Sequence, residues 1–266
     1  SGKGGVGKSN TAINLAIQFR KMGKKVVILD ADFGLANIEI MFGAVPKHNL
    51  SDLIYQGKNI KDIITWGPME VGFISGGSGI TGLSNLSKDY LTYIVHNLAE
   101  LDTIADVIIV DTGAGISDAV LEFLVASGEI LLVTTPEPTS ITDSYSLLKA
   151  LNGHPGLERD NTQICMIANR VSTANEGEVL FQKLDVVVSR YLKLPITYLG
   201  AVPQDPLLAK AVMQQLPVSL QNPQARSAQA YEEIAAKLMK QDEGQNTQKR
   251  GVAAFFSHII GKRNNG

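Results

Sequence analysis

Short runs of apolar residues alternate along the chain with longer stretches in which apolar positions recur every three or four residues. The short runs are typical of strands buried on both faces, and the longer stretches have the period of amphipathic helices. Strands are predicted at residues 26–29, 71–75, 107–110, 130–134, 164–168 and 199–202. Helices are predicted at 9–22, 87–101, 141–151, 176–191, 206–214 and 223–240, with two short pieces within 48–64 and a further helix that starts at Ser117. The alternation predicts an α/β fold with a mostly parallel sheet and helices on both faces.

A glycine-rich loop precedes the first predicted helix. Gly2, Gly7, Lys8 and Ser9 fit the phosphate-loop pattern G-x-x-x-x-G-K-[ST]. Glycines let backbone N–H groups converge on a phosphate, and the helix that follows directs its positive end at the same anion. We expect Lys8 to contact the β- and γ-phosphates and Ser9 to bind Mg²⁺. The predicted phosphate-binding residues are Gly2, Lys3, Gly4, Gly5, Val6, Gly7, Lys8, Ser9 and Asn10.

Aspartates stand where two of the predicted strands end. Asp30 and Asp32 follow the strand at 26–29, and Asp111 follows the strand at 107–110. Open α/β sheets bind ligands at the carboxyl ends of their strands, so the three carboxylates are predicted to serve a metal ion and water. The alternative is that they cap helices. Residues 33–39 and the glycine-containing stretch 112–116 are predicted to form two switches that sense the γ-phosphate.

Composition limits the remaining choices. The 266 residues are enough for one large α/β domain, and the net charge of −2 gives no sign of nucleic-acid binding. Cys165 is the single cysteine, which excludes an intrachain disulfide and a Cys-x-x-Cys metal site. The residues given contain no signal peptide, so we expect a cytoplasmic protein. Because a phosphate loop ordinarily follows a strand, we expect the central strand to precede Ser1 in a longer protein.

The last part of the chain differs from the rest. Residues 1–240 are predicted to form the globular domain and 241–248 a polar linker. Residues 249–266 are predicted to form a basic amphipathic helix that binds the inner face of the cytoplasmic membrane. The alternative is a helix that docks on the domain or on a partner. Its apolar face would be Val252, Phe255, Phe256, Ile259 and Ile260, flanked by Lys249, Arg250, Lys262 and Arg263.

The phosphate loop carries a second lysine, Lys3, and in this it resembles the deviant Walker A loop of the MinD/ParA family of dimeric ATPases. The resemblance implies a three-layer P-loop NTPase fold, ATP or ADP with Mg²⁺ as cofactors, and a homodimer in which Lys3 reaches the partner's nucleotide. The sequences of residues 32–38, 111–117 and 134–144 are most similar to those of the FlhG (FleN) branch of the family.

The resemblance also implies roles for individual residues. Lys3, Lys8 and Asp32 would be catalytic, with Asp32 ordering the attacking water, while Asp30 and Asp111 would support hydrated Mg²⁺. Asp143 matches a position that pairs with the signature lysine when the dimer is apart. Glu137 would lie near the partner's ribose. The adenine pocket would comprise Asn169, Arg170, Pro203, Gln204 and Asp205, although Asn169 by itself fits a turn equally well.

These implications together predict a slow, dimer-dependent ATPase that converts ATP to ADP and phosphate and binds the membrane in its ATP state. In the FlhG branch such a switch controls the number or placement of flagella, with the GTPase FlhF and flagellar switch or regulatory proteins as partners. The alternatives are a MinD-like division-site ATPase and a ParA-like partitioning ATPase. A ligase or kinase and a non-catalytic ATP sensor are further alternatives, whereas an iron–sulfur carrier would need more cysteines than Cys165.

Overall fold

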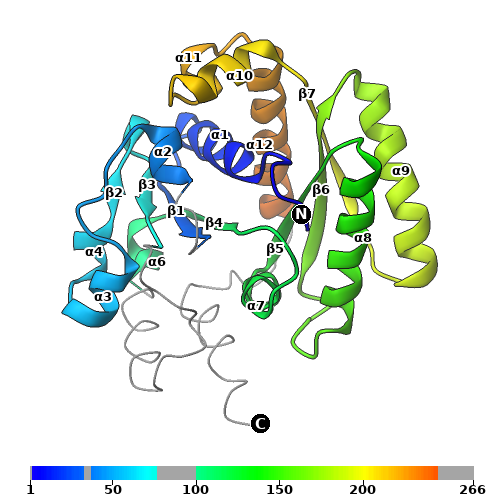
Figure 1. Ribbon diagram of the computed structural model, residues 1–266, viewed down its shortest axis with the longest axis horizontal. Coiled ribbons are helices and arrows are strands. Elements are labelled where there is room, and N and C mark those ends of the chain that lie inside the picture. Colours follow the sequence, from blue (N-terminus) through cyan, green and yellow to red (C-terminus); the bar gives the residue numbers. More distant parts are fainter. Residues whose placement is uncertain (1, 33–36, 77–99, 245–266) are drawn as a thin grey trace.

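A computed structural model describes residues 2–32, 37–76 and 100–244, and its strands form two hydrogen-bonded sheets (Figure 1). The first sheet has the order β2-β3-β1-β4 and the second the order β5-β6-β7. All neighbouring strands run parallel except β2 and β3. The strands are β1 (Val26–Ala31), β2 (Thr65–Trp66), β3 (Gly72–Ile74), β4 (Val107–Thr112), β5 (Glu129–Thr134), β6 (Gln163–Val171) and β7 (Thr197–Pro203). The predicted parallel α/β architecture is confirmed, and each of the six predicted strands is present.

Helices cover both faces of the sheets. The helices are α1 (Lys8–Lys21), α2 (Ile38–Phe42), α3 (Leu50–Gln56), α4 (Ile60–Ile63), α6 (Leu101–Ile104), α7 (Asp118–Ala126), α8 (Pro138–Gly153), α9 (Ala174–Tyr191), α10 (Pro206–Met213), α11 (Val218–Gln221) and α12 (Arg226–Gly244), with a 3-10 turn η1 (Pro68–Glu70). The sequence did not predict β2, α2, α6 or α11, because these elements are too short to show a periodic pattern. The predicted helix at 87–101 lies almost wholly outside the described residues, and so does the tail from 245 onward. Helix α12 extends to Gly244, four residues into the segment predicted as a linker.

Strand β6 shows why the strands read as continuous apolar runs. Cys165 and Ile167 face the core formed with α1 and α12, whereas Ile164, Met166 and Ala168 face the core formed with α8 and α9. Alternate side chains point to opposite faces of a sheet, so a strand covered on both sides must be apolar at every position. These two cores define the layers, with α1, α2 and α10–α12 on one face and α7–α9 on the other.

A cavity of about 780 Å³ separates the two sheets, and the facing strands β4 and β5 line it. Within the described residues, β4 pairs with β1 alone and β5 with β6 alone. The carbonyl of Gly2 accepts a hydrogen bond from the Gly115 N–H, so the start of the phosphate loop lies beside the loop that follows β4. A strand leading into the phosphate loop would run along this cavity, and that strand stays a prediction.

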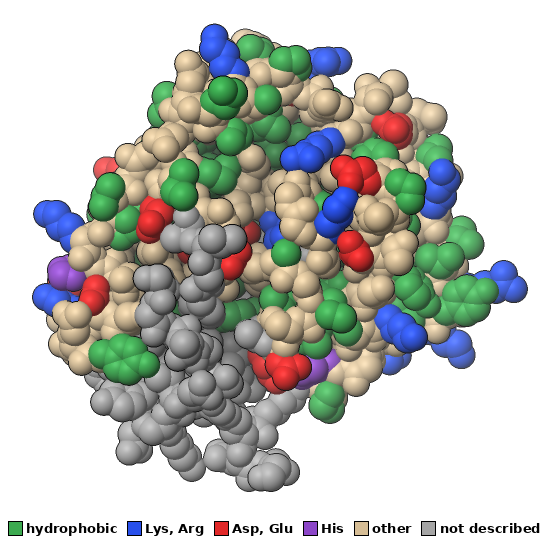
Figure 2. Space-filling view, in the orientation of Figure 1, with side chains coloured by type: hydrophobic (Ala, Val, Ile, Leu, Met, Phe, Trp, Pro, Cys, Tyr) green, Lys and Arg blue, Asp and Glu red, His purple; other side chains and the backbone are tan. Residues whose placement is uncertain are grey.

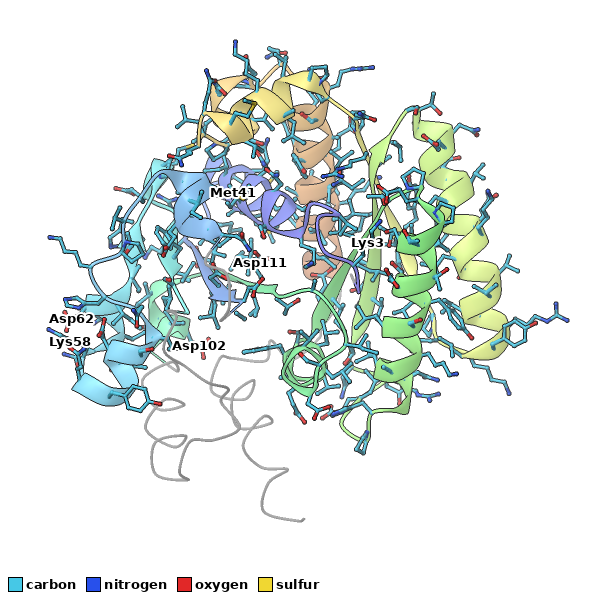
Figure 3. All side chains as sticks on the ribbon, viewed as in Figure 1. Lys3, Met41, Lys58, Asp62, Asp102 and Asp111 are labelled. Carbon is cyan, nitrogen blue, oxygen red and sulfur yellow. The ribbon has the colours of Figure 1, made fainter. Side chains whose placement is uncertain are left out.

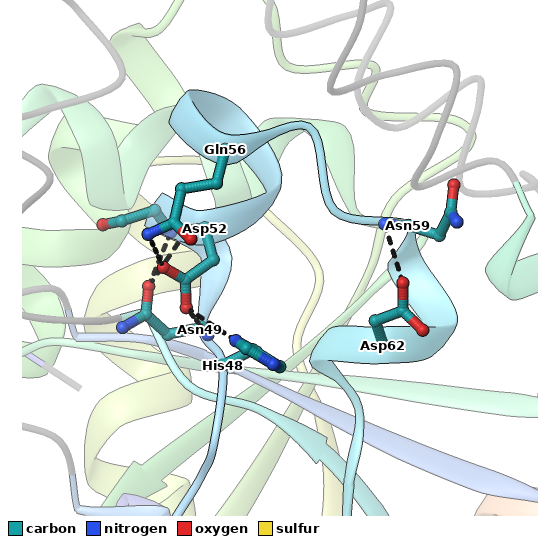
Figure 4. A network of polar contacts seen from close by, with 7 residues as sticks. His48, Asn49, Asp52, Gln56, Asn59 and Asp62 are labelled. Carbon is teal, nitrogen blue, oxygen red and sulfur yellow. Dashed lines mark hydrogen bonds and ion pairs between the residues drawn. The ribbon is translucent and has the colours of Figure 1, made fainter.

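Asparagine and aspartate fix the starts of α3 and α4, as Figure 4 shows. The Asn49 side chain accepts the Ser51 N–H at 2.8 Å, while Asp52 accepts the Asn49 N–H at 2.9 Å. Asn59 and Asp62 form a second capping box. Such caps satisfy N–H groups that have no partner within the helix. Asn49 is therefore the N-cap of α3.

A buried polar cluster attaches α1 to α11 and α12. The Asn14 side chain accepts the Ser219 N–H at 3.0 Å, and the Gln18 amide donates to the Ser219 hydroxyl and to the Ala228 carbonyl, both at 3.2 Å. Asn14, Gln18 and Ser219 are almost completely buried. Buried polar groups need partners, so these bonds fix the position of α11 against the helix that follows the phosphate loop.

Asp205 joins the starts of α10 and α12. Its carboxylate accepts the Leu207 N–H at 2.9 Å and the Ser227 hydroxyl and N–H at 2.8 and 3.1 Å. Burial raises the pKa of Asp205, but the hydrogen bonds from Ser227 and Leu207 outweigh burial and hold the pKa below its ordinary value. Ionised Asp205 therefore stabilises the fold.

Replacing Asp205 by Asn should reduce the free energy of unfolding by about 1–3 kcal/mol at neutral pH, because three hydrogen bonds lose their charged acceptor. A lowered pKa gives stability that is complete above the ordinary aspartate pKa of about 3.9 and is lost as the pH falls below it. Urea denaturation at pH 7 and pH 3 measures both effects. The difference between wild type and Asp205→Asn should shrink at pH 3; an equal difference at both pH values would contradict the assignment.

Candidate functional site

The phosphate loop, residues 2–9, curves around the N-terminal end of α1. Gly5 and Gly7 have φ angles of 74° and 98°, in the left-handed region where side chains are rarely tolerated. Gly7 is the N-cap of α1, and no side chain caps this helix end. The free N–H groups and the positive end of α1 therefore face the loop, which is the arrangement that binds phosphate.

Asn169 fastens the loop to the second sheet. Its amide donates to the Val6 carbonyl at 2.7 Å, and its carbonyl oxygen accepts the Arg170 N–H. A Cβ atom at Gly7 would lie 2.3 Å from the Asn169 amide nitrogen, so a larger residue cannot be placed there without displacing Asn169. Asn169 lies within β6 and is almost completely buried, which excludes the turn that the sequence allowed as an alternative.

Asp30 and Asp111 lie side by side at the ends of neighbouring strands. The two residues are register partners of β1 and β4, and both side chains are at least 95% buried. Burial raises the pKa of Asp30 to about 6 against the opposing backbone hydrogen bonds from Ile38 and Asp32, and the charge of Asp111 adds to the rise. Two carboxylates in such a place need positive charge or N–H donors.

The two aspartates have different partners. Asp30 accepts the N–H groups of Asp32, Asn37 and Ile38 at 3.1 to 3.3 Å, and the last two stand at the start of α2. Asp111 instead accepts a hydrogen bond from the Ser9 hydroxyl. Asp30 therefore does the capping that the sequence offered as an alternative to metal binding, and its predicted support of hydrated Mg²⁺ stays a prediction.

Lys8 provides the positive charge beside these carboxylates. Its ammonium lies near Asp111 and Asp32 and donates to the Lys3 carbonyl at 3.3 Å. Burial lowers the pKa of Lys8, and the charges of Asp111 and Asp32 oppose this effect. Burial also raises the pKa of Asp111, against the Ser9 hydrogen bond and the Lys8 charge. Ser9, Lys8 and Asp111 thus converge on one point in front of α1.

Asp32 faces the stretch that follows β4. A Cβ atom at Gly113 would lie 3.4 Å from the Asp32 carboxyl carbon, so this glycine leaves room for the carboxylate. Gly115, two residues further on, donates its N–H to the Gly2 carbonyl at 3.0 Å. The predicted second switch at 112–116 therefore contacts both the phosphate loop and Asp32. Residues 33–36 of the predicted first switch lie outside the described part of the chain.

Lys3 extends toward α8, whereas Asp111 lies at the end of β4 (Figure 3). The Lys3 ammonium forms an ion pair with Glu137 and donates to the Thr139 hydroxyl at 2.9 Å. The hydrogen bond and charge of Lys3 hold the pKa of Glu137 below its usual value. Resemblance suggested Asp143 as the partner of this lysine and Glu137 as a contact of the neighbouring subunit, so the Glu137 pair was not foreseen. At Asp143 the structure shows its backbone packed against Gly2.

The residues predicted for the adenine pocket lie together, but some of their side chains already form hydrogen bonds to other parts of the protein. Asn169 is bonded to the phosphate loop and Asp205 to α10 and α12. Arg170 is exposed, with a φ of 57°, and the Gln204 N–H donates to the Val171 carbonyl at the end of β6. Pro203 pairs with Val171. An adenine site at these strand ends stays a prediction.

Two functional contacts had no signal in the sequence. Thr139 lies in the first turn of α8, and its hydroxyl accepts a hydrogen bond from Lys3 because the fold brings this turn close to the phosphate loop. Gly115 contacts Gly2 across more than a hundred residues of chain. Both depend on tertiary placement, and no local pattern could have identified them.

The geometry of the site fits a nucleoside triphosphate with Mg²⁺. The glycine loop supplies converging N–H groups, Lys8 supplies charge, and the Ser9 hydroxyl beside Asp111 supplies the oxygen ligands that Mg²⁺ prefers. Asp32 lies against the glycine stretch after β4 and close to Lys8. The arrangement is suited to phosphoryl transfer, in which catalysis consists of positioning and charge neutralisation.

Comparison with known proteins agrees with this assignment. A ParA family model, described as NUBPL iron-transfer P-loop NTPase, matches residues 1–239. The antiactivator FleN of Pseudomonas aeruginosa is 38% identical over 237 residues, which cover 89% of this chain and 83% of FleN. The flagellum site-determining protein YlxH of Helicobacter pylori is 33% identical over 264 residues, covering 98% of this chain and 87% of YlxH.

Among solved structures, the septum site-determining protein MinD of Pyrococcus horikoshii, complexed with Mg-ADP, superposes with a TM-score of 0.68. The identity is 23%, and the match covers 91% of this chain and 94% of that chain. Similarity at this level establishes the fold. The iron transfer in the family description has no support in the cysteine content, because burial raises the pKa of Cys165, the single cysteine, to about 12 and thiolates are the usual iron–sulfur ligands.

No helix in the described part of the chain is both long and apolar enough to cross a membrane. The predicted membrane-binding helix at 249–266 lies outside that part.

Replacing Gly7 by Ala should strongly weaken nucleotide binding, because the added Cβ would collide with the Asn169 amide and the φ of 98° is unfavourable for alanine. Gly128→Ala is the matched control, since a Cβ there meets nothing within 4 Å. Fluorescence titration with a labelled ADP should show at least a hundredfold weaker binding for Gly7→Ala alone. Equal affinities would show that the loop does not bind the phosphates.

Proposed function

The chain belongs to the ParA/MinD family of P-loop NTPases, and we propose that it is an ATP-hydrolysing switch that dimerises with ATP. We further propose that it binds the membrane in that state and controls the number or placement of flagella. The flagellar assignment is supported by the similarity to FleN and YlxH. The related MinD fold supports division-site placement as the nearest alternative.

The observation that carries the proposal is the placement of the two lysines of the loop. Lys8 lies inside the site beside Asp111, where a nucleotide of the same subunit would bind. Lys3 instead lies at the surface, about one-third exposed, on the partly exposed Glu137. An exposed ion pair of this kind is weak, so Lys3 can leave it for a stronger partner. The β- and γ-phosphates of a nucleotide held by a second subunit would be such a partner.

Each residue then has a defined task in hydrolysis. Lys8 neutralises charge on the β- and γ-phosphates, and Ser9 with Asp111 would hold hydrated Mg²⁺, which would neutralise charge on the phosphate oxygens. Asp32 orients the attacking water and Lys3 of the partner neutralises charge that develops in the transition state. Loss of the γ-phosphate removes what the two switches contact, and the subunits separate.

Lys3→Ala should abolish ATP-dependent dimers and lower the rate of ATP hydrolysis by about 10³-fold, the low end of what a cation supplied in trans contributes. Binding of ADP should stay, because Lys8 and the loop N–H groups are intact. Size-exclusion chromatography with light scattering and a phosphate-release assay measure the two effects, with the exposed Lys183→Ala as control. If Lys3→Ala still forms an ATP-dependent dimer of unchanged size, Lys3 does not act on the nucleotide of the partner subunit.

Asp32→Ala should lower the rate of phosphate release by about 10² to 10⁴-fold, the range expected for loss of a side chain that acts on the attacking water. ATP should still bind, and the dimers should last longer because turnover has stopped. The exposed Asp160→Ala is the matched control. Normal turnover in Asp32→Ala would exclude this residue from positioning the water. Analysis of the products tests the reaction class, since a ligase or kinase would yield more than ADP and phosphate.

Co-sedimentation with anionic vesicles tests the membrane part of the proposal. The full chain should sediment with ATP and much less with ADP, because one short amphipathic helix binds weakly and a dimer carries two. A chain that ends at Gln248 should stay in the supernatant with either nucleotide. Sedimentation that depends on neither the nucleotide nor the tail would overturn the membrane switch and leave the ATPase assignment untouched.

A further inference from the structure

Large apolar side chains are exposed around the C-terminal ends of α2 and α10. Ile40 and Val45 belong to the α2 side, and Met213 and Leu216 belong to the α10 side, with Val45 and Met213 exposed to 89% and 86%. The two sides adjoin, because a Cβ atom at Gly43 would lie 3.5 Å from the Gln215 side chain. We call Ile40, Val45, Met213 and Leu216 the α2–α10 patch. Figure 2 shows hydrophobic side chains gathered on this face, over α2, α10 and α11.

Lysines outnumber acidic residues along the segments that form the α2–α10 patch, where Glu39 of α2 directly precedes Ile40. Residues 40–48 and 206–225 contain no aspartate or glutamate. Their lysines are Lys47 and Lys210, and both are exposed. Exposed apolar patches mark interaction sites, and the centre of a protein interface is poor in charge with polar residues at its rim. A partner complementary to this surface therefore carries apolar anchors flanked by acidic residues.

Each half of the patch is attached to the phosphate site by buried polar contacts. Asp30 holds the start of α2 through the Asn37 and Ile38 N–H groups. On the other side, Ser219 of α11 is bonded to Asn14 and Gln18 of α1, the helix that begins at the phosphate loop. Movement of Asp30 relative to α1 would change the spacing of the two halves. A ligand that spans both halves would therefore bind with an affinity that depends on the nucleotide.

We propose that the α2–α10 patch docks an acidic amphipathic helix of a partner protein and that the bound nucleotide sets the affinity of this docking. The nucleotide dependence rests on the proposed function, whereas the docking itself rests on the surface. The apolar anchors enter the patch at helical spacing, and their acidic neighbours face Lys47 and Lys210.

Two other occupants fit the surface less well. Lipid recognition by cationic clusters usually takes four to eight lysines or arginines, and the patch segments offer Lys47 and Lys210. A second copy of the chain, docked patch to patch, would place these lysines against their own equivalents, which is repulsive in a two-fold contact.

A phage-displayed library of random 16-residue peptides, selected on the full ATP-loaded chain, supplies the probe. Selected peptides should carry apolar residues at i, i+3 or i+4, and i+7 together with a net negative charge. Val45→Glu and Met213→Glu should weaken a synthetic selected peptide at least tenfold, and Lys210→Glu should weaken it most at low salt. Val186→Glu is the matched control, because Val186 is 62% exposed on the distant helix α9. Basic or neutral peptides, or equal losses in Val186→Glu, would overturn the proposal.

Further measurements separate the alternatives. If the chain ending at Gln248 binds vesicles and Met213→Glu abolishes this binding, the patch binds a membrane. If Met213→Glu abolishes the ATP dimer, the patch binds a second copy of the chain. Either result overturns the proposal. Equal peptide affinity with ATP and ADP would overturn the nucleotide dependence. If the wild type forms no ATP dimer but still binds the peptide at the patch, the proposed function is overturned and the docking proposal stands. If the ATP dimer forms but no selected peptide binds at the patch, the docking proposal is overturned and the proposed function stands.

Discussion

The hydrogen bond from the Asn169 amide to the Val6 carbonyl is the contact on which the site depends. It fixes the phosphate loop to β6 at the point where Gly7 turns through the left-handed region into α1. Because no atom larger than hydrogen fits on Gly7 beside Asn169, the loop has one path across the carboxyl ends of the strands. The Gly115–Gly2 bond fastens the same loop to β4. The loop thereby links the two sheets.

The electrostatics of the site follow from burying charges of both signs close together. Burial raises the pKa of Asp111 and lowers that of Lys8, so each group needs the other to stay charged. Asp30, on the neighbouring strand, is satisfied by backbone N–H groups and becomes the cap of α2. Two aspartates at equivalent strand ends thus differ in role because their neighbours differ. The same division lets Asp30 hold α2 and its end of the α2–α10 patch, while Asp111 remains with Ser9.

Lys3 illustrates how an exposed contact can suit a switch. A buried pair would be costly to break, whereas the Lys3–Glu137 pair is open to water and screened by salt. In the proposed dimer, Lys3 would leave this pair for the nucleotide of the second subunit. The loop thus combines an exposed ion pair at Lys3 with backbone hydrogen bonds to Asn169 and Gly115.

The sequence by itself determined the strands and long helices, the phosphate loop and the carboxylates at the strand ends, because apolar periodicity and the glycine–lysine spacing are local properties of the chain. It did not determine β2, α2, α6 or α11, which are too short to show a periodic pattern. Only the tertiary structure decided that Asp30 caps α2, that Lys3 lies on Glu137 and Thr139, and that Asn169 holds the loop. These choices are made between residues far apart in the chain, where packing brings donors and acceptors within hydrogen-bonding distance and burial forces each of them to find a partner.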